Sequence, residues 1–114
     1  AYTELASLGR TRTLAYRVGG AGIRQRTEDV LNRDAAALIG DVLADPHARR
    51  LEFGSGDLLR MPLRTAVKTG TSTDYRDAWA FGFSGRFVVG IWFGNLDRRP
   101  MDEVSGARGP ALLL

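Results

Sequence analysis

The 114-residue sequence contains no cysteine, a single histidine and a single lysine. Without cysteine the chain can form neither disulfide bonds nor a catalytic thiolate, although this absence leaves its compartment open. His47 stands at a helix start and no His-Glu-x-x-His pattern surrounds it, so we expect no metal and no cofactor. No run reaches the roughly 20 apolar residues of a membrane helix, and we expect any membrane anchor to lie outside this chain.

The charge of the sequence is mildly basic, with a formal net charge of +3 and a pI near 9.9. Such a charge can attract nucleic acid or an anionic membrane surface. All basic residues except Lys68 are arginines, however, and they are scattered among acidic residues from Arg10 to Arg108 without a basic block. We therefore expect a solvated surface of mixed charge and no nucleic-acid partner.

Lys68 lies in the most informative stretch of the chain, residues 66–73 followed by residues 77–83, and begins its motif Lys68-Thr69-Gly70-Thr71-Ser72. A compact ammonium stands here although every other basic position carries the planar fork of arginine, which could not replace it conservatively. A Lys-Thr-Gly triplet on a strand is one of three elements of the serine acyl-transfer sites of penicillin-binding proteins and β-lactamases. Alone it is a weak signal, because chance produces it roughly a few times in a hundred chains of this size.

Each residue of this stretch suits acyl transfer for a physical reason. Lys68 supplies a cation beside the nucleophile and the substrate carboxylate, to which the hydroxyls of Thr69 and Thr71 can donate. Gly70 lacks the side chain that would block close backbone approach. If a peptide pairs alongside as an added strand, the N–H that follows Gly70 can point at the developing oxyanion. Hydroxyls on a solvated edge strand would give the same pattern without any function.

The first half of the sequence predicts helices and one weak hairpin. Residues 1–9 end on Gly9 as at a helix C-terminus, and residues 13–18 and 23–27 can pair as strands across a glycine-rich break. Asn32 is a good N-cap for a helix through Ala44, and a shorter helix over residues 46–51 precedes a loop at 53–62. The longer helix carries one apolar stripe, formed by Ala35, Leu38, Ile39, Val42 and Leu43.

The second half predicts three strands at residues 65–73, 78–84 and 87–95. In the middle strand Trp79, Phe81 and Phe83 face one side, and the short link 84–86 makes the last two strands antiparallel neighbours. Residues 87–93 are almost continuously apolar, which predicts burial on both faces. A turn at residues 95–100 and a last helix capped by Ser105 follow. The predicted fold class is α+β, with a three-stranded antiparallel sheet and packing helices.

The run from Val67 to Phe83, with residues 89–95 and 101–106, resembles the C-terminal part of the transpeptidase domain of class A bifunctional penicillin-binding proteins, most closely their 1C type. The resemblance implies that residues 1–114 are a C-terminal portion of that domain and that the sheet belongs to a five-stranded one. It implies an enzyme on the periplasmic side of the bacterial inner membrane that cross-links peptidoglycan stem peptides through a serine acyl-enzyme and binds β-lactams.

The same resemblance assigns roles to residues. Lys68 would be catalytic, and Thr69, Gly70, Thr71 and Ser72 would bind substrate along the strand. Thr71 would contact the substrate carboxylate, while its N–H would serve the oxyanion hole. Asp77 and Trp79 are expected to be structural.

Two elements of the family pattern are missing from this sequence. The residue three positions before Lys68, the only lysine, is Thr65, so the sequence contains no Ser-x-x-Lys. We reject Thr65 as the nucleophile, because it would lie on the motif strand itself. The sequence contains no Ser-x-Asn either. We therefore expect the chain alone to be inactive. Its partner would be the missing N-terminal part of the domain or a second copy, bound along the apolar edge of residues 87–95.

Two other functions remain compatible with the sequence. The first is a non-catalytic module that binds peptides or β-lactams through the edge strand. The second is a fragment of a serine β-lactamase or D,D-carboxypeptidase, which shares the triplet, although residues 74–83 resemble the class A synthases better.

Overall fold

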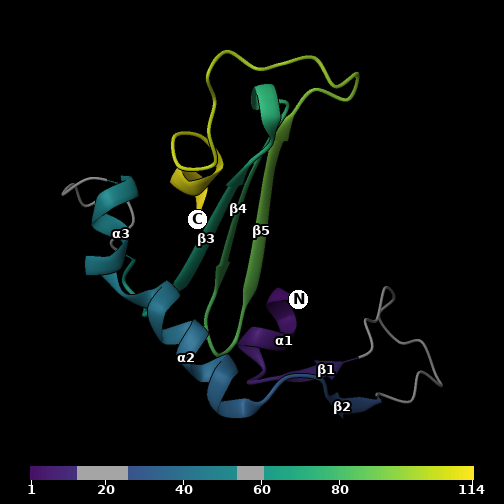
Figure 1. The fold of residues 1–114 in the computed structure, drawn as a ribbon, viewed down its shortest axis with the longest axis vertical. Coiled ribbons are helices and arrows are strands. Elements are labelled where there is room, and N and C mark those ends of the chain that lie inside the picture. Colours follow the sequence, from purple (N-terminus) through teal and green to yellow (C-terminus); the bar gives the residue numbers. More distant parts are fainter. Residues whose placement is uncertain (13–25, 54–60) are drawn as a thin grey trace.

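The computed structural model describes residues 1–12, 26–53 and 61–114, and its fold is α+β (Figure 1). The elements are α1 (Tyr2–Ala6), β1 (Arg10–Arg12), β2 (Thr27–Asp29), α2 (Arg33–Ala44), α3 (Pro46–Phe53), β3 (Ala66–Thr71), η2 (Thr73–Tyr75), β4 (Asp77–Phe83), β5 (Val88–Gly94) and η3 (Pro110–Leu113).

The main sheet is antiparallel, with strand order β3-β4-β5. Its register places Lys68 opposite Phe81 and Trp79 opposite Trp92. Ser84 N donates to Phe87 O at 2.9 Å and closes the tight hairpin between β4 and β5. The three predicted strands and their antiparallel order are confirmed, with ends shifted by one or two residues.

The two faces of this sheet are covered by different segments. On one face the Tyr2 ring of α1 stacks on Phe81 with ring centroids 4.2 Å apart. On the other face Ala80 is completely buried and packs with Val67 against Ala111 of the C-terminal segment, which is yellow in Figure 1. The small side chains of β4 on this second face let the C-terminal segment lie close to the sheet.

Helix α2 begins as the sequence predicts, because the Asn32 side chain accepts hydrogen bonds from the backbone N–H groups of Asp34 and Ala35. An apolar stripe usually faces the core, but here Leu38 remains 65% exposed and Val42 55% exposed. The buried residue of the helix is Ala36.

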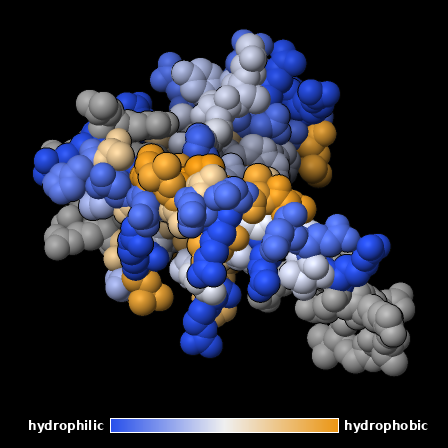
Figure 2. Space-filling model, turned by 60° about the horizontal axis from the view of Figure 1, so that its bottom comes forward, coloured by the Kyte–Doolittle hydropathy of each residue, from blue (hydrophilic) through white to orange (hydrophobic). Residues whose placement is uncertain are grey.

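The apolar stripe of α2 stays largely exposed because the small residues of the helix allow the closest approach to the sheet. A Cβ added to Gly40 would lie 4.0 Å from the ring of Phe83, so the small face of α2 packs there. Leu38, Ile39 and Val42 consequently remain exposed, and Leu43 is half-buried. Figure 2 shows apolar side chains exposed between charged ones on this end of the molecule.

Helix α3 follows at once, as predicted, with Pro46 in its first turn and Asp45 Oδ1 accepting from His47 N at 2.8 Å. It extends to Phe53, where the sequence predicted the start of a loop; the rest of that loop to residue 60 lies outside the described residues. Burial lowers the pKa of Arg49, and the negative charge of Asp45 opposes this shift.

Gly9 ends the N-terminal helical segment, as predicted, and has φ of +90°. A Cβ at this position would lie 2.3 Å from Leu31 O, so a side chain is excluded by both backbone conformation and space. The following hairpin pairs β1 with β2, with Arg10 opposite Asp29. The predicted strands at 13–18 and 23–27 lie outside the described residues except for the end of the second.

Two predictions about the C-terminal half are wrong. Strand β5 is not buried on both faces, because residues 88–90 are exposed and residues 91–94 are only half-buried. Among the described strands it is also an edge of the sheet. Ser105 caps a turn through Arg108 N at 3.2 Å rather than a helix. The short 3-10 helix η3 follows only at Pro110.

Candidate functional site

The predicted motif lies on β3, which is an edge strand: among the described strands it pairs with β4 alone. Lys68 and Gly70 are exposed on the face that also carries Trp79 and Phe81. Thr69 is 8% exposed and lies on the opposite face. The alternation of the strand therefore separates the cation from the threonine side chains.

The backbone of β3 presents hydrogen-bonding groups at the open edge. Ser72 N donates to Asp77 O at 2.8 Å, so these two residues form a hydrogen-bonded antiparallel pair. Such pairs alternate with non-bonded pairs along the ladder. Thr71 and Thr69 are therefore in non-bonded pairs with β4 residues, and their N–H and C=O groups point away from β4. An extended peptide added to the sheet would approach β3 from this side.

The Lys68 ammonium lies at this same edge. Its Nζ donates to the outward carbonyl oxygen of Thr69. Above the neighbouring Gly70, a Cβ would find no atom within 4 Å. The strand thus combines a cation, outward backbone groups and open space over a glycine.

The hydroxyls of the motif are engaged as acceptors. Thr71 Oγ1 accepts from Gly106 N at 3.0 Å, and Ser72 Oγ accepts from Asp77 N at 2.8 Å. A hydroxyl that accepts still carries one proton to donate. Both side chains can therefore bind an anionic group while holding the local backbone. Sequence reasoning assigned no role to Gly106, although residues 101–106 were part of the resemblance.

The turn that follows β3, at residues 73–76, supports the candidate site. Asp74 and Tyr75 both have positive φ, of +60° and +52°, a conformation that costs energy in residues other than glycine. Tyr75 O accepts from Met101 N at 3.0 Å, and Asp77 Oδ1 accepts from the Trp92 indole N–H at 2.9 Å. Asp77 thus ties β4 to β5, as its predicted structural role requires.

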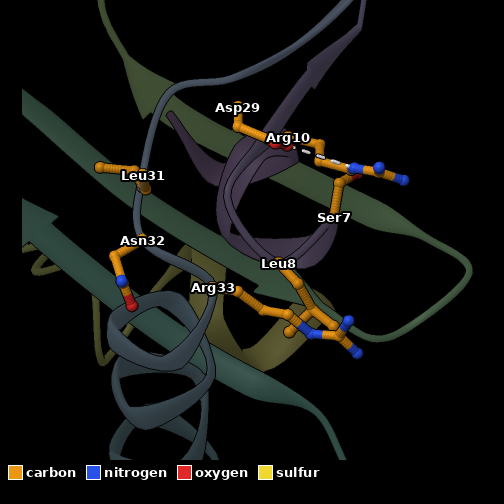
Figure 3. Close-up of a pocket in the computed structure, with 7 residues that line it drawn as sticks. All are labelled: Ser7, Leu8, Arg10, Asp29, Leu31, Asn32 and Arg33. Atoms are coloured by element: carbon orange, nitrogen blue, oxygen red, sulfur yellow. Dashed lines mark hydrogen bonds and ion pairs between the residues drawn. The ribbon is translucent and has the colours of Figure 1, made fainter.

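A cavity of about 500 Å³ lies beside the segment that follows the first helix, and it is lined by residues within 7–10 and 29–33. Figure 3 shows Arg10 paired with Asp29 at its rim, with Nε and Oδ1 3.3 Å apart. Leu8 and Arg33 also line this cavity. None of the predicted site residues lines it.

The described ranges, residues 1–12, 26–53 and 61–114, hold no cluster of three or more His, Cys, Asp or Glu side chains that could bind a metal ion. No helix in these ranges is long and apolar enough to cross a membrane.

Three curated proteins match the chain. It is 35% identical over 105 residues to penicillin-binding protein 1C of Escherichia coli, a match that covers 86% of this chain and 13% of that protein. It is 41% identical over 62 residues to penicillin-binding protein 1B of Vibrio cholerae, covering 52% of the chain and 8% of the relative. For penicillin-binding protein 1A of Aquifex aeolicus the identity is 43% over 44 residues, or 38% of the chain and 6% of the relative.

The chain therefore spans 13% or less of the length of these relatives. No protein-family model matches it.

Proposed function

Because this chain is a relative of the class A penicillin-binding proteins, we propose that it is the substrate-strand portion of a peptidoglycan D,D-transpeptidase domain. Residues 1–114 form a C-terminal part of that domain in this proposal. The enzyme cross-links stem peptides through a serine acyl-enzyme on the periplasmic side of the bacterial inner membrane. The observation that carries the proposal is the position of β3 at the edge of the sheet among the described strands, with the lone lysine at that edge beside the Thr69 carbonyl.

In the proposed mechanism the acyl donor docks along β3 as an added strand. A serine from another segment of the full-length protein attacks the scissile carbonyl, with the Lys68 ammonium beside it as an electrostatic partner. The Thr71 N–H donates to the oxyanion of the tetrahedral intermediate. The exposed hydroxyls of Thr71 and Ser72 serve the substrate carboxylate, and Gly70 leaves room for the donor. As the tetrahedral intermediate collapses, the scissile C–N bond breaks and the amine of the C-terminal fragment leaves with the serine proton. An amine of a second stem peptide then attacks the ester, takes the acyl group and returns a proton to the serine oxygen.

A labelled penicillin tests this function. A β-lactam acylates the serine in place of the stem peptide, so the full-length protein should give a covalent fluorescent band on a denaturing gel. This chain alone should give none, because it contributes no nucleophile in this mechanism. Boiled protein and competition with excess unlabelled penicillin are the controls. Reversible binding without a band from the full-length protein would instead identify a non-catalytic binding module.

The partner of β5 is the second part of the proposal. Phe87 and Val89 are exposed by 64% and 46% along a strand edge that lacks a neighbour among the described residues. Exposed apolar strand edges pair with other chains. We propose that the N-terminal part of the same domain covers this edge, and that a second copy covers it when that part is absent.

We accordingly expect the isolated chain to self-associate. Light scattering at micromolar concentration should show dimers or larger species, and the substitution Val89→Lys should shift them toward monomer, because a charge at a strand edge opposes pairing. Thr27→Lys, an exposed change in the separate strand β2, is the matched control. A monodisperse monomer of the unmodified chain would contradict the proposed exposed interface.

A further inference from the structure

The segment after β5 contacts the motif strand through a glycine. Gly106 is buried, and a Cβ on it would lie 2.6 Å from Trp79 O, 2.8 Å from Gly70 O and 3.0 Å from Gly70 N. Gly70 and Trp79 are cross-strand partners in β3 and β4. The atoms in the way are all backbone, so they cannot move aside as a flexible side chain would. Only glycine fits here without a shift of the sheet or of the segment.

The same residue makes a directed hydrogen bond to the site. Gly106 N donates to Thr71 Oγ1 at 3.0 Å, across 35 residues of sequence. Since Gly106 is buried, this bond satisfies a backbone N–H that would be costly to leave unpaired. The bond also occupies one acceptor position of the hydroxyl, so the Thr71 proton must point elsewhere.

The segment that carries Gly106 is itself held in place. Ala111 N donates to Gly106 O at 3.1 Å, and Arg108 N donates to Ser105 O at 3.2 Å. A Cβ on Gly109 would lie 2.6 Å from the Val104 side chain, which shows how tightly the turn is packed. The amide of Gly106 is therefore a fixed donor, and the Thr71 hydroxyl is the group that adapts to it.

We propose that Gly106 is a positioning residue for this site. Its amide fixes the rotamer of Thr71, and thereby directs the Thr71 hydroxyl proton toward the carboxylate of a bound acyl donor. This inference rests on the proposed acyl-transfer function. It adds that residues 105–109, which contain none of the motif, set the orientation of the carboxylate-binding group.

The test uses the full-length protein and benzylpenicillin. Gly106→Ala should lower the second-order acylation rate per folded molecule by about 10- to 100-fold, the range for a lost hydrogen bond to a charged group. Gly85→Ala is the matched control, because a Cβ there meets no atom within 4 Å and the residue lies in the distant β4–β5 turn; its rate should equal the wild type.

Two comparisons separate positioning from general destabilisation. The effect of Gly106→Ala should nearly disappear in a Thr71→Val background, and it should shrink when the probe is benzylpenicillin methyl ester, which lacks the carboxylate. An unchanged effect in both comparisons would overturn the inference while leaving the proposed function intact. If the wild-type protein is not acylated at all, the proposed function itself fails and this inference falls with it.

A second measurement avoids any clash that could prevent folding. Hydrogen exchange of the Gly106 amide should accelerate by about tenfold or more in Thr71→Val, which removes its acceptor, and should change little in Thr71→Ser. Equal protection in all three proteins would show that Thr71 does not hold this amide. That result would overturn the inference even if acylation is normal.

Discussion

Replacing Lys68 with alanine is expected to lower the rate of penicillin acylation of the full-length protein by about 10²- to 10³-fold, the usual cost of removing one preorganised electrostatic group. Lys68 lies at the open edge of β3, where its ammonium already contacts the outward carbonyl of Thr69. An acyl donor that pairs with this edge would take over that carbonyl and place its reacting group beside the ammonium. Stopped-flow or gel-based acylation at several penicillin concentrations gives the rate.

The lower acylation rate of Lys68→Ala should result from a slower chemical step and not from unfolding of the protein. Lys68 is exposed, and surface substitutions away from special features change the free energy of unfolding by about 0.5 kcal/mol or less. Arg64→Ala is the matched control, because Arg64 is an exposed cation shortly before the same strand and pairs with Asp41 at 2.6 Å. A surface pair of this kind contributes about 0–1 kcal/mol. This control should keep the acylation rate of the wild type.

Lys68→Arg makes the prediction more specific. It keeps the positive charge but replaces a compact donor with a planar fork of different reach, so most of the activity should be lost as well. If Lys68→Arg and Lys68→Ala both acylate at the wild-type rate, Lys68 has no part in the chemistry. The resemblance of the motif would then be coincidental.

The strands could be predicted from sequence because their signal is local. The alternation of Trp79, Phe81 and Phe83 and the short link at 84–86 fix both the faces and the hairpin, whatever lies around them. The Asn32 cap is local in the same way, since its side chain bonds to the next turn. These predictions needed no knowledge of tertiary neighbours.

The errors arise where burial depends on a neighbour. The apolar stripe of α2 was visible in the sequence, but the small residues at Ala36 and Gly40 determine which face reaches the sheet. The apolar run of β5 likewise predicted burial, but a strand is buried only if another segment covers it. Periodicity describes what a segment can bury and not what is present to bury it.

The residues of the candidate site also differ in whether the sequence could predict them. Lys68 to Ser72 could be found from five consecutive letters, because a strand keeps its motif together. Gly106 could not, because the register between a distant turn and the β3–β4 pair brings its amide to Thr71. Glycine is common in turns of every kind, so its presence at position 106 does not by itself indicate a contact with the motif.

A side chain at Gly70 should abolish ligand docking without harming the fold. In Gly70→Val the new Cβ meets no atom of the chain within 4 Å, and strands favour β-branched residues. Even Gly70→Ala should raise the free energy of unfolding slightly, by about 0.5–1 kcal/mol, because glycine in a strand loses more backbone entropy on folding. Thermal or urea unfolding of the full-length protein checks this half of the prediction.

The effect of the substitution on function should be opposite to its effect on stability, because acylation should become slower. Gly70 and Lys68 are on the same face of β3, two residues apart, so an acyl donor that reaches the ammonium must pass close over Gly70. A valine there holds the donor away from the strand by more than an ångström, and a displacement of that size costs about 10²-fold in rate. Acylation by labelled penicillin should fall by at least this factor in Gly70→Val and by less in Gly70→Ala.

The contrast with Gly85→Val distinguishes docking from a general effect of side-chain bulk. Gly85 is equally open, with no atom within 4 Å of an added Cβ, but it lies in the turn that joins β4 to β5. Its substitution should leave acylation unchanged. Normal acylation of a well-folded Gly70→Val protein would show that the donor does not approach over this face of β3.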